Sequence, residues 1–292
     1  MALFIDRRLT KAGRRLACGA AGCPALYRTN TRSIIIRTAM WVFVLSIMSC
    51  HANALDIDQD QYNLYLSGEI KAADLKNIVA AVSPPQTFPK NFILNSPGGN
   101  VREAMAIGQF IRETATQTYV EKSCSSACIF LLIAGVSQGV WNDADIGLHR
   151  PYFDPVEFSG LSLPDADKKY KILHSITKNY LEEMGMTTAA IEKMFSVASD
   201  NVYYLSPQEK SAIFSGPSAY QEWMRAKCNP PTAAESEQFK ARGFNYFERF
   251  DKKPPTDPRF WDFIAKLDLA KKCEGSLVNS VREAALTKYQ RK

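Results

Sequence analysis

Short apolar segments alternate with amphipathic ones between residues 62 and 149, and this alternation limits most strongly how the chain can fold. Residues 62–70 and 91–95 have the composition of strands, whereas residues 72–82 and 101–114 carry apolar side chains at helical spacing. Because helices separate the strands, crossover connections must join them. The pattern predicts an α/β fold with a mostly parallel sheet covered on its faces by helices.

The alternation continues to about residue 216, and the composition then changes. The further elements expected are a strand at 117–122, a buried helix at 127–135, strands within 139–149, helices at 166–186 and 187–199, a strand at 201–205 and a helix after Ser206. Residues 217–292 are richer in charged and aromatic side chains and are interrupted by prolines. We expect residues 1–54 to be a signal or anchor, 55–216 the main domain and 217–292 a helical extension.

The net charge of +6 does not indicate a nucleic-acid partner, because the excess lies at the N-terminus. Residues 1–54 contain eight of the 36 Lys and Arg but one of the 30 Asp and Glu, which leaves 28 basic and 29 acidic residues in 55–292. A nearly neutral body offers no basic surface to a polyanion. We therefore expect no nucleic-acid partner.

The N-terminal segment has the features of a secretory signal. Basic residues precede a short, mostly apolar run at 38–49, and Ala52-Asn53-Ala54 follows as a cleavage site with small residues. The run is short for a membrane span. The sequence predicts an exported protein, periplasmic or secreted. The alternative is an uncleaved anchor, which would attach the protein to a membrane. It is also open whether the true start codon lies further downstream.

Cleavage after Ala54 would leave four of the seven cysteines, namely Cys124, Cys128, Cys228 and Cys273. An even number of cysteines in an exported chain favours disulfides over free thiols. Four cysteines allow three pairings, and the sequence does not select one. Local spacing makes Cys124–Cys128 with Cys228–Cys273 the first expectation.

Three short segments carry residue types that catalysis uses, and each also has an ordinary structural explanation. Gly98 and Gly99 lie between a predicted strand and a predicted helix, where they could offer N–H groups to an oxyanion or only form a tight turn. Ser126 could be a nucleophile or a helix cap worth about 1 kcal/mol. His149, at a strand end, could accept a proton from a nearby hydroxyl.

Together these segments resemble the ClpP family of serine peptidases within the ClpP/crotonase fold, and in particular an exported ClpP-like branch. Four segments occur in that family's order: LNSPGGNVREAMAIGQFIRE, CSSACIFLLIAG, ADIGLHRP and DNVYYLSPQE. The resemblance covers roughly residues 60–216. It implies repeated β-β-α units around a mostly parallel sheet, followed here by the C-terminal extension.

The resemblance implies a serine hydrolase, most simply a peptidase that acts on peptides or unfolded polypeptide without a cofactor or a metal. It places the nucleophile on Ser126 and the general base on His149. The N–H groups of Gly98 or Gly99 and of Ala127 would hold the oxyanion, and the helix that begins there would add its dipole. A homo-oligomer is a further expectation, because the helix at 166–186 stands where ClpP-like proteins assemble.

The third member of the triad is where this sequence departs from the family's pattern. Asp200 is the nearest match to the family's aspartate, but two extra residues separate it from the following helix, and an acid in a surface turn is an equally good explanation. Cys124 and Cys128, on either side of Ser126, also depart from the family. If reduced, they could bind a metal together with His149, although such a site is one ligand short.

Three other functions remain open on the sequence. A noncatalytic scaffold or binding protein could keep the fold without activity. Acyl-CoA chemistry would use the same oxyanion turn, but export separates the protein from cytosolic CoA thioesters. A Ser/Lys dyad would need Lys122, whose position just before the turn does not match the lysine of such enzymes.

Overall fold

The computed structural model describes residues 55–83, 88–141, 143–214, 216, 218–244 and 256–291. The signal or anchor expected over 1–54 lies outside the described residues. Within the described ranges, no helix is long and apolar enough to span a bilayer.

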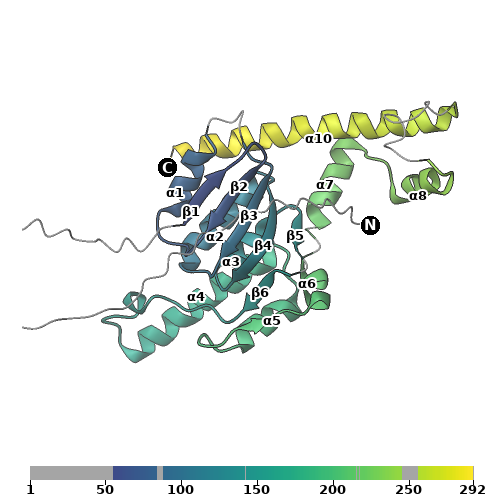
Figure 1. The fold of residues 1–292 in the computed structure, drawn as a ribbon. Coiled ribbons are helices and arrows are strands. Elements are labelled where there is room, and N and C mark those ends of the chain that lie inside the picture. The colour runs from purple at the N-terminus through teal and green to yellow at the C-terminus, as the bar shows by residue number, and fades with distance from the viewer. Residues whose placement is uncertain are drawn as a thin grey trace, which may run out of the picture. The chain divides into compact units, whose positions relative to one another are not determined.

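A seven-stranded, mostly parallel sheet forms the centre of the fold (Figure 1). Its order is β1-β2-β3-β4-β6-β7, and β5 also pairs with β4. The outer pairs β1/β2 and β6/β7 are antiparallel, and the others are parallel. The strands are β1 Asp56–Gln59, β2 Asn63–Ser67, β3 Asn91–Ser96, β4 Gln117–Ser125, β5 Gln138–Val140, β6 Asp145–Leu148 and β7 Tyr203–Tyr204. The predicted α/β class is confirmed.

The helices follow the strands as the sequence pattern indicates. Those of the main domain are α1 Asp74–Ala81, α2 Val101–Glu113, α3 Cys128–Ala134, α4 Leu163–Glu183, α5 Thr188–Ser196 and α6 Pro207–Ile213, with a short 3-10 helix at Pro155–Glu157. Local capping fixes where several begin. The side chain of Asn100 accepts a hydrogen bond from the Glu103 N–H at the start of α2, and Ser206 and Glu209 form a reciprocal capping box before α6.

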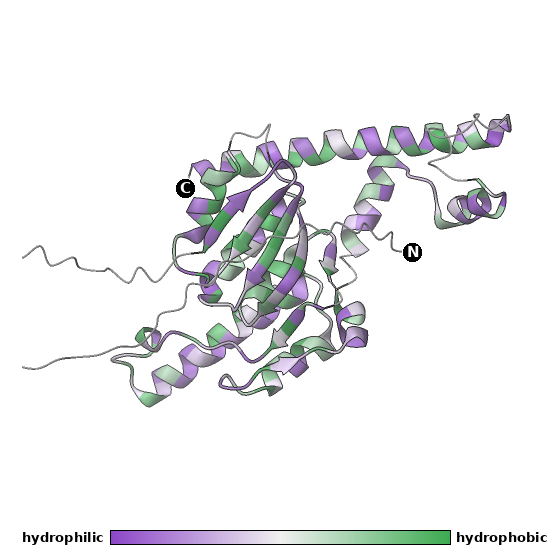
Figure 2. Ribbon diagram, viewed as in Figure 1, coloured by the Kyte–Doolittle hydropathy of each residue, from purple (hydrophilic) through white to green (hydrophobic). Residues whose placement is uncertain are grey.

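Alternating side chains bury one face of the sheet. Leu64 and Leu66 of β2 and Phe92 and Leu94 of β3 are at most 1% exposed, whereas the residues between them are half-buried. Figure 1 shows α1, α2 and α3 behind the strands, and Figure 2 shows apolar residues concentrated in the central strands. The expectation of helices on the faces of the sheet therefore holds for one side of β2 and β3.

Two strands differ from the sequence expectation. β1 lies in a polar segment that gives no strand signal, and it forms because its backbone pairs with β2. β4 continues to Ser125, beyond the predicted end at residue 122. Its last residues are polar, but Cys124 pairs with Ser96 on one side and with Ile146 on the other, so the backbone ladder extends the strand.

Side chains from α2 and α4 hold the buried helix α3 in place. Arg112 of α2 donates hydrogen bonds to the carbonyl groups of Ala134, Ile133 and Met184, at the ends of α3 and α4. Tyr180 of α4 donates to the carbonyl of Phe130 at 2.8 Å. Burial raises the pKa of the Tyr180 hydroxyl, which therefore stays protonated as a donor.

The C-terminal extension contains three described helices, α7 Ser218–Cys228, α8 Ala233–Ala241 and α10 Pro258–Gln290. The end of α10 joins the main core: the Tyr289 ring lies edge-on to Phe110 at 5.0 Å, and the Arg282 Nε donates to the Thr114 carbonyl. The beginning of α10 instead packs with α8 in a separate aromatic cluster. The domain boundary at 216/217 stays a prediction.

Replacing Tyr180 with phenylalanine tests the link between α4 and α3. Tyr180→Phe removes one buried hydrogen bond and should lower the free energy of unfolding by about 1 kcal/mol. Urea denaturation followed by circular dichroism measures this. Tyr170→Phe, on the exposed side of α4, is the control and should change stability by no more than about 0.5 kcal/mol. Equal effects of the two substitutions would contradict the assigned role.

Candidate active site

Ser126 occupies a strained turn between β4 and α3. Its φ is +56°, in the left-handed region, which costs a side chain other than glycine roughly 1–2 kcal/mol. The Ser126 N–H donates to the Gly147 carbonyl at 3.0 Å, and its own carbonyl accepts from the Ile129 N–H at 3.1 Å. Residue Ala127 is the N-cap of α3, and no side chain caps this helix. The explanation of Ser126 as a helix cap is therefore wrong. Its side chain is half-buried.

Gly98 packs directly against this turn. With φ at +105°, a Cβ on Gly98 would lie 2.6 Å from the Ser126 Cβ and 2.8 Å from the Ala127 nitrogen. No real side chain tolerates such contacts with backbone, so only glycine fits. The Gly98 N–H donates to Ser96 Oγ at 3.1 Å, and its carbonyl accepts from the Ile70 N–H at 2.8 Å. The N–H of Gly98 is therefore already used inside the protein.

Two other backbone N–H groups remain available at the same place. Gly99 lines a cavity together with Ser126, and a Cβ on Gly99 would collide with the Ile70 backbone. Among the described residues, neither the Gly99 N–H nor the Ala127 N–H donates to a protein acceptor. Of the predicted oxyanion donors, the N–H groups of Gly99 and Ala127 thus have no protein acceptor among the described residues, whereas that of Gly98 has one.

His149 follows β6 and is half-buried. Its Nδ1 lies 2.9 Å from the carbonyl oxygen of Arg150, and the Arg150 N–H is in turn held by the Val197 carbonyl at 3.0 Å. In the neutral tautomer that donates the Nδ1 proton to this carbonyl, Nε2 carries no proton and can accept one. No hydrogen bond joins His149 to Ser126 among the described residues, although both line the same cavity.

Asp200 does not contact His149 in this structure. It is exposed, its Oδ1 lies 3.4 Å from the Asn201 Nδ2, and no hydrogen bond or ion pair connects it to the imidazole within the described part of the chain. The carbonyl of Arg150 takes the position at Nδ1 that a triad aspartate would occupy. The assignment of Asp200 stays a prediction without a supporting contact.

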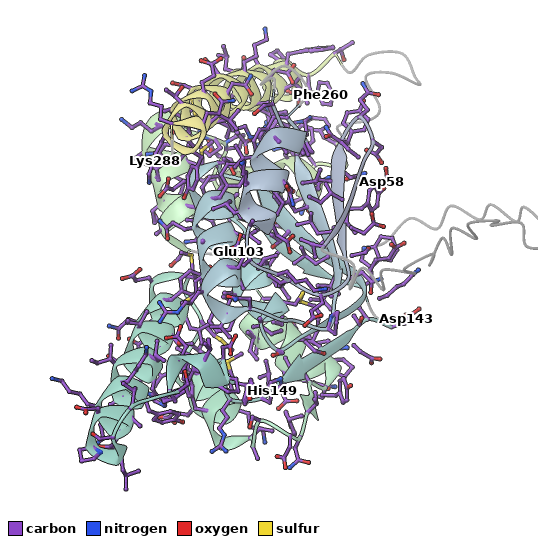
Figure 3. The ribbon with its side chains drawn as sticks, turned by 90° about the vertical axis from the view of Figure 1, so that its left-hand side faces the viewer. Asp58, Glu103, Asp143, His149, Phe260 and Lys288 are labelled. Carbon is purple, nitrogen blue, oxygen red and sulfur yellow. A yellow bond between two sulfur atoms is a disulfide. The ribbon has the colours of Figure 1, made fainter. Side chains whose placement is uncertain are left out.

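The cavity beside Ser126 has a volume of about 590 Å³, which is within the range of small-molecule and peptide subsites. The loop that follows His149 forms one wall through Tyr152, Phe153 and Pro155. Figure 3 shows His149 at the end of the molecule far from Phe260 and Lys288 of α10. The cavity is therefore remote from the C-terminal helix.

An ion-pair network ties this loop to the body of the protein. Glu157 at the end of the loop pairs with the Arg102 Nε of α2 at 2.9 Å and with the Lys169 Nζ of α4 at 2.6 Å. The hydrogen bond from Lys169 and the charges of both cations lower the pKa of Glu157. The Phe153 ring also lies edge-on to Tyr170, at 6.0 Å. These contacts hold the loop over the cavity.

The four described cysteines form two disulfides in the expected pairing. Cys124–Cys128 has a Cα–Cα distance of 5.3 Å and encloses Ser126, and both cysteines are 0% exposed. Cys228–Cys273 joins α7 to α10 with a Cα–Cα distance of 5.5 Å. The metal alternative at Cys124, Cys128 and His149 is wrong, because the disulfide uses both sulfur atoms that it required.

Sequence reasoning missed two partners in the site. The carbonyl of Arg150 gave no signal, since every residue carries the same backbone oxygen. The network of Arg102, Glu157 and Lys169 joins three segments whose charges are ordinary surface charges in the sequence. The fold brings these three residues together, and their spacing along the sequence does not indicate it.

Comparison with known proteins agrees with this geometry. A sequence model of the Clp protease family matches residues 60–213, which is slightly more than half of the chain. The curated proteins compared with the chain gave no significant match.

Neutralising Glu157 tests the attachment of the loop. Because the folded-state pKa of Glu157 is lowered, its ion pairs are complete above the ordinary carboxyl pKa and are lost as the pH falls through the lowered value. Glu157→Gln should therefore lower, at neutral pH, the protection of the amides of residues 150–162 against hydrogen exchange, measured relative to their intrinsic rates, as acid does in the natural protein.

The matched control is Asp167→Asn, which removes an exposed i,i+4 pair with Lys171 on α4 and should leave exchange in the loop unchanged. Mass spectrometry of exchanged peptides measures both variants. Identical loop exchange in Glu157→Gln and the natural protein would show that the network does not restrain the loop.

Proposed function

The chain belongs to the Clp protease family, and on this premise we propose that it is a serine peptidase with Ser126 as nucleophile and His149 as general base. The observation that carries the proposal is the strained, half-buried Ser126 on the wall of a cavity that it shares with His149 and Gly99. A residue held in a rare backbone conformation at a strand-to-helix turn is typical of functional sites. The substrates proposed are peptides or unfolded polypeptide, as the family suggests.

The proposed first step is attack of Ser126 Oγ on a substrate carbonyl carbon. His149 Nε2 takes the hydroxyl proton as the bond forms and later returns it to the departing amine. The two side chains must approach to about 2.6–3.2 Å for this transfer. Because no hydrogen bond joins them here, the proposal requires the Ser126 hydroxyl and His149 Nε2 to come together when substrate binds.

The N–H groups of Gly99 and Ala127 are the proposed oxyanion donors. Both are free of protein acceptors in the described part of the chain, and both lie beside Ser126. Each such donor contributes roughly 3 kcal/mol to transition-state stabilisation in acyl transfer. Gly98 has a different role in the proposal: it permits the close approach that brings the turn after β3 against Ser126.

The carbonyl of Arg150 is the proposed orienting group for His149. A carbonyl dipole fixes the tautomer of the imidazole, but it stabilises an imidazolium less than a full negative charge does. The proposed enzyme would therefore be slower than one with a complete Ser-His-Asp triad, unless Asp200 moves to the imidazole when substrate binds.

A noncatalytic scaffold is the second candidate, and a specific observation favours it. Ser126 and His149 share a cavity without a hydrogen bond, and no carboxylate among the described residues contacts the imidazole. A protein that had kept the fold to bind peptides, but had lost hydrolysis, would show the same two features. Covalent labelling of Ser126 distinguishes the two candidates.

We also propose that the protein acts outside the cytosol and as a homo-oligomer. Two disulfides fit an oxidising compartment, in agreement with the signal expected over 1–54. Membrane attachment would apply only if that segment is not cleaved. Apolar side chains exposed on α4 and the loop before it offer a contact surface for a second copy: Val156, Leu163, Ile172 and Ile176.

Reaction with a fluorophosphonate tests the proposed nucleophile. Ser126→Ala should abolish labelling, and His149→Ala should lower the labelling rate constant by about 10²–10⁴ because the general base is lost. The controls are the neighbouring Ser125→Ala and His174→Ala, on the surface helix α4, which should both be labelled like the natural protein. No labelling of the folded natural protein would favour the scaffold.

Adding one methyl group at Gly98 tests the close approach. Gly98→Ala should lower kcat on a peptide substrate by about 100-fold, because the Cβ displaces Ser126 and Ala127 from the reacting carbonyl. Gly68→Ala is the matched control. Gly68 has a similar φ of +96° but no atom within 4 Å of its Cβ position, so only backbone strain is added. A loss of kcat of the same size in Gly68→Ala would contradict the explanation.

A further inference from the structure

The Cys124–Cys128 disulfide closes a loop of five residues with Ser126 at its centre. Cys124 belongs to β4 and Cys128 is the first residue of α3, so the bond joins the strand to the helix across the strained turn. Both cysteines are fully buried, and the strand side is fixed by pairing of Cys124 with Ser96 and Ile146. The disulfide therefore fixes the start of α3 relative to the sheet.

Apart from the disulfide, the close approach of Gly98 and backbone hydrogen bonds hold this turn. Ser126 makes one hydrogen bond to Gly147 and accepts one from Ile129. Helix α3 has no capping side chain, although the first turn of a helix leaves several N–H groups without intrahelical partners. Without a cross-link, rotation of Ser126 out of the left-handed region would relieve its backbone strain. The same rotation would displace both the Ser126 hydroxyl and the Ala127 N–H.

We propose that the Cys124–Cys128 disulfide is a positioning device for Ser126, and that the site is competent only when this bond is formed. The inference rests on the function proposed above. It makes Cys124 and Cys128 positioning residues, which act through the backbone of the turn and do not touch the substrate. The enzyme would then work in an oxidising compartment and lose activity where thiols keep cysteines reduced.

The chemistry of the switch is a thiol–disulfide exchange. A dithiol such as dithiothreitol gives up two hydrogens and becomes a cyclic disulfide, while the Cys124–Cys128 bond breaks and each sulfur gains one hydrogen. Both sulfurs are buried, so the reagent reaches them only when the turn opens. Cys228–Cys273 is half-exposed between α7 and α10 and should be reduced first.

The second disulfide supplies the matched control. It lies in the C-terminal extension, where it joins α7 to α10, and Figure 3 shows His149 far from Phe260 and Lys288 of α10. The described lining of the Ser126 cavity includes no residue of α7 or α10. Removal of the Cys228–Cys273 bond should affect the stability of the protein without changing the geometry of the turn at Ser126.

The experiment compares Cys124→Ala/Cys128→Ala with Cys228→Ala/Cys273→Ala and with the natural protein, first oxidised, then reduced and reoxidised. The first double variant and the fully reduced protein should react with a fluorophosphonate about 100-fold more slowly. In hydrolysis of a peptide substrate, their kcat should change more than their KM. Reoxidation should restore the rate. The Cys228→Ala/Cys273→Ala variant should react like the oxidised natural protein.

Amide hydrogen exchange of Ser126 and Ile129 provides a readout that does not need activity. Exchange at these two amides should be about tenfold faster without the Cys124–Cys128 bond and unchanged without Cys228–Cys273. If the first double variant does not fold, reduction and reoxidation of the Cys228→Ala/Cys273→Ala variant, which keeps only the Cys124–Cys128 bond, supplies the comparison. Equal labelling rates and equal exchange with and without the Cys124–Cys128 bond would overturn the proposal.

The two proposals fail in different ways. If the oxidised natural protein is not labelled, but its exchange at Ser126 depends on the disulfide, the peptidase function fails and the positioning role stands. If labelling is equally fast in both redox states, the positioning role fails and the peptidase function stands.

Discussion

The close approach of Gly98 to Ser126 is the contact on which the rest of the site depends. Because Gly98 has no side chain, the turn after β3 lies directly against the turn after β4. The register of these strands shifts between Leu94 and Ser96, which places Ser96 opposite Cys124 and extends the pairing to the edge of the site. Gly99, whose N–H has no protein acceptor among the described residues, follows Gly98 directly and lines the same cavity as Ser126.

The order of the strands explains how segments far apart in the chain meet. Strands β3, β4 and β6 are neighbours and run in parallel, so their carboxyl ends lie at one edge of the sheet. Gly98, Ser126 and His149 each follow one of these three ends. Binding sites of α/β proteins occur at this edge because the loops there can vary without disturbing the strands.

Much of this arrangement could be predicted from the sequence, because four motifs, SPGG and the buried segment after Ser126 among them, resemble the ClpP family in their order. The order of elements followed from hydrophobic periodicity, whereas the disulfide pairing was only the first expectation among three until the structure showed it. The hydrogen-bond partner of His149 could not be predicted, because it is a backbone carbonyl oxygen and every residue carries one. For Asp200 the sequence offered only proximity to a motif, and proximity along the chain does not determine where a side chain points.

Helix α2 connects the site with the C-terminal extension. It starts at Val101, just after Gly99, and its far end meets α10, where Arg282 binds the Thr114 carbonyl and Tyr289 covers Phe110. A chain shortened by the last turns of α10 would expose an aromatic ring and an unsatisfied helix terminus to water. The end of α10 therefore contributes to the packing of the main domain. A related chain without this helix would need polar residues at the corresponding positions of α2.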